Sequence, residues 1–257
     1  MTMTPVAIVL GTLGVVGLLL ALTRRALPDD PDRPHESAAT AIFSMVGVLY
    51  AVILAFVVIV VWENDGKARD DSQVEANAAS RIYFTARSLP EPQRTELMSL
   101  AHDYVATVAG QEWPLMALGQ TSPRARQHVA AMRLTTHELR PTTADQEILM
   151  ADTLAAVDAL VDSRRERTSA LTAPLTPLMW SGLIVTSGLT VGFMFLFNRP
   201  SFAMHLLMVG SVAALIAFIL WLVYDLSLPF SGWSAVSPEA FEQILQRFQE
   251  FPPDSPS

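Results

Sequence analysis

The chain has 257 residues, of which 51% are hydrophobic and 16% charged, and its formal net charge is -8. An average soluble domain carries about 25% charged residues, so this composition is typical of a protein that hides apolar surface in lipid as well as in a core. The absence of cysteine excludes disulfides, thiolate nucleophiles and cysteine-ligated zinc. Lysine and arginine form no basic stripe, and we therefore predict no nucleic-acid partner.

Four stretches contain no Asp, Glu, Lys or Arg and are long enough to cross a hydrocarbon core of roughly 30 Å. They are residues 5–22, 38–62, 175–197 and 202–224. The first stretch precedes Arg24 and Arg25 where a signal peptide would have small residues, so we interpret it as a retained anchor. We predict an all-α membrane protein with four transmembrane helices in two pairs and a helical extramembrane insert between the pairs.

The predicted organisation has four parts: a first transmembrane helix pair (1–62), the insert (63–174), a second transmembrane pair (175–224) and a C-terminal turn with an amphipathic helix (225–257). Within the insert, the second span is expected to continue as one helix to Leu89, before Pro90. Trp113 and Pro114 are expected to end the next helix. Thr143 and Gln146 predict a capping box for the last helix of the insert, against which we expect the second span's continuation to pack through Val74, Ala78 and Ile82.

The C-terminal helix is predicted to start at Ser237 and Pro238 and to present one apolar face, formed by Phe241, Ile244, Leu245 and Phe248. Its polar face lacks the many lysines and arginines of a helix that lies on lipid, so packing on the insert is the simpler interpretation. In the third span, Gly188 and Gly192 are four residues apart and predict a helix-packing face. An uncharged N-terminus followed by Arg24 and Arg25 favours an extracytoplasmic insert.

Three motifs occur in a fixed order around these spans: LYAVILAFVVIVVWE at 49–63, EWP at 112–114, and YDLSLPFSG at 224–232 followed by VSPEAF at 236–241. Together they resemble a bacterial membrane family described as bestrophin-like, a domain of unknown function, over nearly the whole chain. The resemblance implies kinship with bestrophins, which are pentameric anion channels with a hydrophobic neck, and a bacterial inner (plasma) membrane location. The acidic calcium clasp of bestrophins is not recognisable here. Bestrophins keep their soluble part in the cytoplasm, opposite to the side that the arginines favour.

Signatures of catalysis are missing from the sequence. The five histidines do not fall at metal-ligand spacings, and there is no phosphate-cradling glycine loop and no GxSxG motif. We therefore predict no enzyme, no catalytic residue, no metal site and no cofactor. The four apolar stretches also lack the ionisable residues that mark the pathway of a coupled pump.

Two functions remain open. The first is a homo-oligomeric ion channel with an apolar neck, whose partners are the lipid bilayer, further copies of the chain and inorganic ions. Its pore-lining residues would be Phe56, as the constriction, and Glu63, as part of an acidic mouth. The alternative is a membrane-anchored sensor or scaffold whose insert binds a protein partner.

Two further features bear on the channel hypothesis. Tyr50 lies six residues from Phe56 and therefore on a different helix face, so at most one of them faces a given axis. For the acidic residues that follow the second span, a solvated helix face is a simpler interpretation than a pore mouth; these residues are Glu63, Asp65, Asp70, Asp71 and Glu75.

Overall fold

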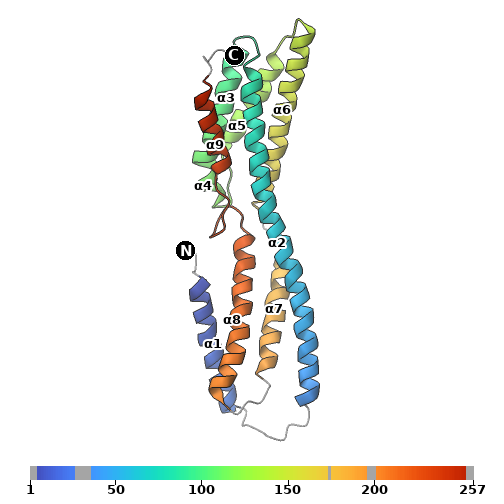
Figure 1. The fold of residues 1–257 in the computed structure, drawn as a ribbon, viewed down its shortest axis with the longest axis vertical. Helices are drawn as coiled ribbons and strands as arrows, with labels where there is room; N and C mark the ends of the chain where they lie inside the picture. Colours follow the sequence, from blue (N-terminus) through green and yellow to red (C-terminus); the bar gives the residue numbers. More distant parts are fainter. Residues whose placement is uncertain (1–4, 27–35, 173–174, 196–200, 253–257) are drawn as a thin grey trace. The chain divides into compact units, whose positions relative to one another are not determined.

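The computed structural model describes residues 5–26, 36–172, 175–195 and 201–252 (Figure 1). All regular elements in these residues are helices, so the predicted all-α class is confirmed for them. The chain divides into two compact units. We call Met1–Glu63 with Pro174–Ser227 the apolar unit, and Asn64–Ala173 with Leu228–Ser257 the polar unit.

The apolar unit contains α1 (Pro5–Ala26), the first part of α2 (Glu36–Ala86), α7 (Pro177–Met194) and α8 (Phe202–Leu226). Four segments of these helices are long and apolar enough to cross a membrane, and they correspond to the four predicted stretches; the segments are Pro5–Thr23, Thr40–Ala86, Pro177–Met194 and Phe202–Leu226. Residues 196–197 of the predicted third stretch lie outside the described residues.

Within the apolar unit, α1 lies against α8 (Figure 1). The two helices approach closely because a glycine of each helix faces a leucine of the other. A Cβ on Gly210 would lie 3.0 Å from Leu13 Cδ2, and one on Gly17 would lie 3.7 Å from Leu206 Cδ1. Small residues permit such contact between helices in lipid, where apolar burial alone does not favour association.

The polar unit contains the rest of α2, α3 (Gln93–Thr107), a π-helix η1 (Val108–Glu112), α4 (Trp113–Met116), α5 (Pro123–Glu138), α6 (Ala144–Ser169) and α9 (Glu239–Glu250). Side chains cap two of these helices. Ser122 Oγ accepts a hydrogen bond from Ala125 N at the start of α5, and Thr143 Oγ1 accepts one from Gln146 N at the start of α6. The Gln146 side chain completes the predicted cap through the neighbouring residue, since its Oε1 accepts from Thr142 N at 2.9 Å.

The helix that contains Trp113 and Pro114 does not end there, contrary to our expectation. It passes through the π-helix and continues to Met116. In a regular α-helix, the ring of Pro114 would clash with the carbonyl of Gly110, and the missing N–H would leave that carbonyl without its partner. A wider π-turn directly before the proline removes this conflict, so the chain keeps its helical direction.

The core of the polar unit is apolar and draws on all its long helices. Ala78 and Ile82 of α2 are buried in it, as predicted, and Val157 of α6 is buried there too. Val74 is 56% exposed and does not belong to the packed face. The predicted apolar face of α9 packs into the same core through residues that include Phe241, Ile244 and Phe248. The ring of Phe248 stacks on Tyr83 with centroids 4.0 Å apart.

Replacing Ile82 by Asp should reveal how much the polar unit depends on this core. Ile82 is fully buried, so the change leaves a carboxylate without a partner and should cost several kcal/mol of unfolding free energy. Val74→Asp, on the exposed side of the same helix, should change stability by less than about 0.5 kcal/mol. Thermal unfolding and protease resistance in detergent measure both variants. Equal losses would show that the burial of Ile82 does not determine stability.

Candidate functional site

One face of α2 presents an uninterrupted row of exposed apolar side chains in the apolar unit. Phe56 is 66% exposed, and it lies seven residues after exposed Leu49 and seven before exposed Glu63. Seven residues are close to two helical turns, so these three side chains share one face. The other exposed large apolar residues of this segment are Ile42, Met45, Val48, Val52, Ile53, Ile59, Val60 and Trp62.

The opposite face of the same segment packs against the other spans. Tyr50, Leu54, Val57 and Val61 are buried there in one cluster with Leu183 of α7 and Ile216 of α8. Tyr50 and Phe56 therefore lie on different faces, as predicted: Tyr50 is 6% exposed, whereas Phe56 points away from its own chain. Sequence spacing thus predicts that the two rings lie on different faces, but not which of them is buried.

Gly188 and Gly192 lie on an exposed part of α7. No heavy atom of another helix, in the described residues, lies within 4 Å of the position that a Cβ would take at either glycine. The packing that we predicted for them therefore involves no helix within this chain in the described residues. It stays a prediction that Gly188 and Gly192 form a helix-packing face.

A buried ionic cluster in the polar unit was not predicted. It consists of Glu75 of α2, Glu112 of η1, and Arg164 and Arg167 of α6. Arg167 binds Glu75 through Nε at 2.6 Å and Nη2 at 2.9 Å, and its Nη2 also donates to Glu112 Oε1 at 3.0 Å. Arg164 Nη2 donates to Glu112 Oε2 at 2.8 Å. Two carboxylates and two guanidiniums thus balance in charge.

Aromatic rings and a thioether enclose this cluster. The guanidinium carbon of Arg167 lies 5.4 Å from the ring centre of Trp113 and 5.6 Å from that of Phe241. Arg167 Nη1 donates to the sulfur of Met116, and the Tyr104 hydroxyl donates to Glu75. Since Glu75, Glu112 and Arg167 are fully buried, each charge depends on its partners and not on water.

The environment of this cluster raises the pKa of Tyr104 and of Arg167. Burial raises the pKa of the Tyr104 phenol well above its ordinary value, and the adjacent Glu75 carboxylate raises it further, so Tyr104 remains a hydrogen-bond donor. Burial alone would lower the pKa of Arg167, but the ion pair and hydrogen bond with Glu75, together with Tyr104 and Glu112, outweigh this effect and raise it. Arg167 therefore remains charged.

The π-turn brings Glu112 into this cluster. Tyr104 and Glu112 are eight residues apart, which in a regular α-helix would rotate one about 80° from the other. The π-turn accommodates one additional residue and returns Glu112 to the face of Tyr104. Apolar spacing and capping residues do not predict such a turn, although it lies directly before Trp113 and Pro114.

The sequence predicts a solvated face for Glu75 and for four other acidic residues. Glu63 and Asp70 are exposed, which both a solvated face and a pore mouth require, and the interpretation is wrong for the three that are buried: Asp65, Asp71 and Glu75. Glu75 lies seven residues from both Ala68 and Ile82, which are fully buried, and this spacing could have identified its inward position. In the part of the chain that the structure describes, no three His, Asp or Glu side chains converge as a metal site would require.

The sequence model of the bestrophin-like domain matches residues 10–241. The chain therefore belongs to the bestrophin-like family, as its motifs suggested, and its four candidate spans make it an integral membrane protein. No curated protein matches it.

Similar folds occur in crystal structures of a bacterial bestrophin homologue from Klebsiella pneumoniae. Two single-residue variants of that homologue align with a TM-score of 0.66, at 15% and 16% identity, over 94% of this chain and 98% of theirs. A further structure of the homologue gives a TM-score of 0.66 at 16% identity, over 94% of this chain and 97% of that one. At this identity, the likeness establishes the fold.

Replacing Arg167 should destabilise the polar unit strongly. Arg167→Ala leaves the carboxylate of Glu75 buried without its ion-pair partner, and breaking a buried pair in this way costs about 3–5 kcal/mol. Arg81→Ala is the matched control, because its ion pair with Asp152 is exposed and such pairs contribute about 0–1 kcal/mol. Thermal unfolding in detergent compares the two. A loss for Arg167→Ala no larger than for Arg81→Ala would contradict a structural role of the cluster.

Proposed function

We propose that the protein is a homo-oligomeric ion channel in which copies of α2 surround an apolar path. The observation that carries this proposal is the exposed apolar row around Phe56 on a segment without charge. One chain cannot enclose a path with a single helix face, so several copies must contribute the same face around an axis. Membership in the bestrophin-like family supports a channel, and not an enzyme, as the class of protein.

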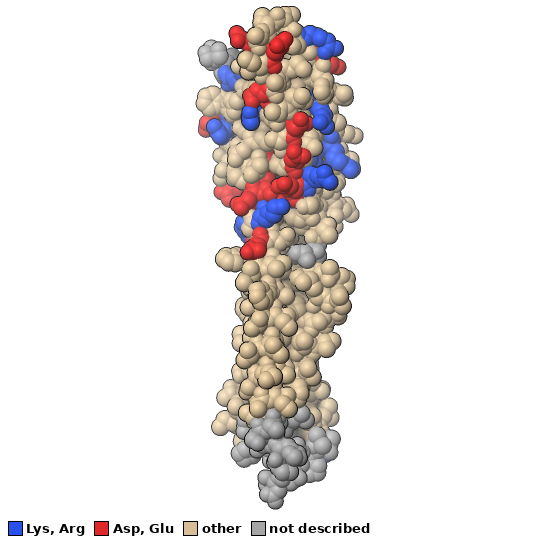
Figure 2. All heavy atoms as spheres, turned by 90° about the vertical axis from the view of Figure 1, so that its right-hand side faces the viewer, with Lys and Arg blue, Asp and Glu red and all other residues tan. Residues whose placement is uncertain are grey.

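The proposed membrane arrangement has two helix pairs (1–62 and 175–224) and the insert (63–174) outside the bilayer, in a bacterial inner membrane. Figure 2 supports an aqueous environment for the insert, because Lys, Arg, Asp and Glu gather over the polar unit on the face it presents. Two ion pairs of this unit, Arg133–Asp158 at 2.9 Å and Arg81–Asp152, are about half exposed. Such pairs are stable in water and costly in lipid.

In this proposal, Phe56 forms the narrowest part of the path. A ring of phenyl groups holds water weakly, so the path conducts when it is wetted and is closed when it is dry. Glu63 follows two turns later on the same face, and a ring of its carboxylates would concentrate cations at the end of the apolar segment. The two residues would thus control gating and ion preference separately.

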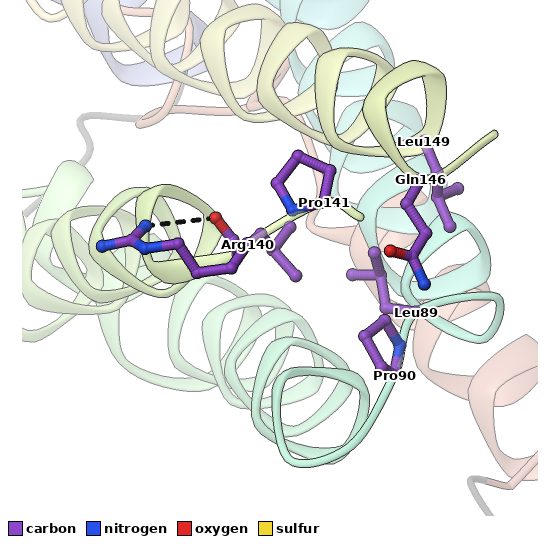
Figure 3. Close-up of a pocket in the computed structure, with 7 residues that line it drawn as sticks. Leu89, Pro90, Arg140, Pro141, Gln146 and Leu149 are labelled. Atoms are coloured by element: carbon purple, nitrogen blue, oxygen red, sulfur yellow. Dashed lines mark hydrogen bonds between the residues drawn. The ribbon is translucent and has the colours of Figure 1, made fainter. Parts of the chain in front are cut away.

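A second candidate function is a scaffold whose insert binds a protein partner. Exposed apolar side chains on the polar unit favour it, notably Leu118, Leu134 and Ile148. A small pocket of this unit has a volume of about 20 Å³ and is lined mainly by leucines and prolines (Figure 3); its residues are Leu89, Pro90, Leu139, Arg140, Pro141, Gln146 and Leu149. Arg140 Nη1 donates to the carbonyls of His137 and Leu139, so this nitrogen is engaged within the segment that follows α5.

Planar-bilayer recordings on the purified oligomer test the channel. Phe56→Ser should raise conductance, because a hydroxyl lowers the cost of wetting the constriction. Val185→Ser is the matched control, since Val185 is 67% exposed but belongs to α7, and it should leave conductance unchanged.

The same recordings test ion preference. Glu63→Gln should reduce the preference for cations over anions, whereas Glu147→Gln, at an exposed residue of α6, should not. Silence of the wild type and all variants, from folded and inserted protein, or a monomer in detergent, would favour the scaffold.

Reporter fusions test the arrangement of the spans. An even number of spans between two points returns the chain to the same side of the membrane, so a reporter inserted at Gly119 and one at the C-terminus should report the same compartment. Gly119 suits an insertion because it lies in a turn after α4 with a φ of 73°. Signals from opposite compartments would mean that α7 or α8 does not cross the bilayer.

A further inference from the structure

The outer face of α6 is exposed along the length of the helix and is acidic. Six exposed residues follow one another on it at spacings of three and four; they are Ile148, Ala151, Ala155, Ala159, Asp162 and Glu166. From Ala144 to Asp162, α6 contains five acidic residues and no Lys or Arg. Figure 1 places α6 at an edge of the polar unit, and Figure 2, which views that edge, shows Asp and Glu exposed on it. This face therefore offers apolar and small side chains that lead to carboxylates.

The exposed side of α5 carries the opposite charge. Arg126, Ala130 and Leu134 follow one another there at intervals of four residues, and all three are exposed. The side chain of Leu134 is 66% exposed. Three of the residues of α5 are arginines, and its one acidic residue is Glu138. Arg126 and Asp162 form no ion pair in the part of the chain that the structure describes, so both charges are available to a partner.

One ion pair shows how the residues of α5 and α6 align. The two helices are antiparallel, because a short connection joins the end of α5 to the start of α6. Arg133 of α5 and Asp158 of α6 lie 2.9 Å apart and mark a common level. Leu134, the next residue of α5, therefore lies at about the level of Ala155 and Ala159.

The charged residues of the two faces also lie at one level. Arg126 comes seven residues before Arg133, which places it about 10 Å further along the helix axis. Seven residues after Asp158, on the antiparallel helix, is a position between Asp162 and Glu166. The basic end of the α5 side and the acidic end of the α6 face thus match in height.

A rotation about an axis that runs along these helices keeps each residue at its level. Such an axis follows from the proposed path, because copies of α2 surround it and α6 runs alongside α2. Two ion pairs join α2 to α6 in antiparallel order, Glu75 with Arg167 and Arg81 with Asp152. Neighbouring copies therefore meet at equal heights, where the basic side of one α5 lies level with the acidic face of another α6.

We propose that α5 of one copy packs on the outer face of α6 of the next, with Leu134 on Ala155 and Ala159 and with Arg126 paired to Asp162. This inference rests on the proposed homo-oligomer and identifies the surfaces that join its copies. The alanines let the neighbouring helix approach closely, and the charges favour this contact over one between two acidic α6 faces. Because the contact uses two different faces, it repeats from copy to copy and closes a ring.

Disulfide cross-linking tests the contact, because the chain has no cysteine of its own. Leu134→Cys is combined in one chain with Ala155→Cys or with Ala159→Cys, and the oligomer in vesicles is oxidised with copper phenanthroline. At least one combination should give a ladder of covalent species larger than a dimer, since every copy carries both halves of the contact and a disulfide requires close approach. A mixture of the two single variants should give covalent dimers only.

Charge reversal tests the ion pair in the same double-cysteine chain. Arg126→Glu should lower the cross-linking rate about tenfold, because it replaces an attraction by a repulsion. Adding Asp162→Arg should restore most of the rate. Arg94→Glu, on the exposed surface of α3, is the matched control and should leave the rate unchanged. The melting temperature of each variant, measured in parallel, shows that the polar unit is folded.

A second control tests the choice of α6. Leu134→Cys combined with Asn77→Cys places the second thiol on the exposed side of α2, and it should give no ladder. Leu134→Cys alone should give no covalent dimer, because the proposed contact does not bring two copies of this residue together.

The outcomes separate this inference from the proposed function. A ladder that Arg126→Glu slows and Asp162→Arg restores supports the contact, whether or not the oligomer conducts. The inference is overturned, and the channel remains, if a conducting oligomer gives no ladder or if either part of the second control cross-links as fast. A monomer in both detergent and vesicles, without cross-links, overturns both proposals.

Discussion

A guanidinium cut off from water must be surrounded by acceptors, and Arg167 meets this requirement by drawing together most of the polar unit. Its partners come from α2, η1 and α4, and the ring of Phe241 comes from α9. A hydrophobic side chain at 167 could fill the same volume, but it would not specify which segments meet there. The pairing of Glu75 and Glu112 with one arginine therefore selects one register of α2 against α6 and explains why a wide turn at 108–112 is retained despite its cost.

In the apolar unit, one face of α2 packs against neighbouring helices and the opposite face is exposed. Leu54, Val57 and Val61 form the contact with the neighbouring spans, while Phe56 and Glu63 lie on the side that its own chain leaves open. Substitutions on the open face can alter the proposed path without disturbing the fold. The packed face also carries a hydrogen bond, between Tyr50 Oη and Ser187 Oγ of α7 at 2.8 Å.

Most of the architecture could be predicted because lipid imposes a simple pattern: long stretches without charge. The helix starts at Pro123 and Ala144 were also predictable, since proline and a capping threonine act locally. The burial of Glu75 was missed because a charged residue beside a span usually faces water, and only its partners on a helix more than 80 residues later make burial tolerable. The continuation past Trp113 was missed because proline commonly ends a helix unless a π-turn precedes it. The spacing of apolar residues along the chain reveals neither ion pairs between distant helices nor local irregularities within a helix.

The distribution of the cluster along the chain also orders the events of synthesis. Glu75 and Glu112 are synthesised before Arg164 and Arg167. The two carboxylates therefore cannot form their ion pairs until α6, which carries the two arginines, has been made. Phe241, which encloses Arg167, follows only after α7 and α8 have been made. The polar unit therefore cannot close around its charges during translation of its own main segment. Its last element, α9, is synthesised after α8, so folding of this unit is completed only when all four apolar helices have been made.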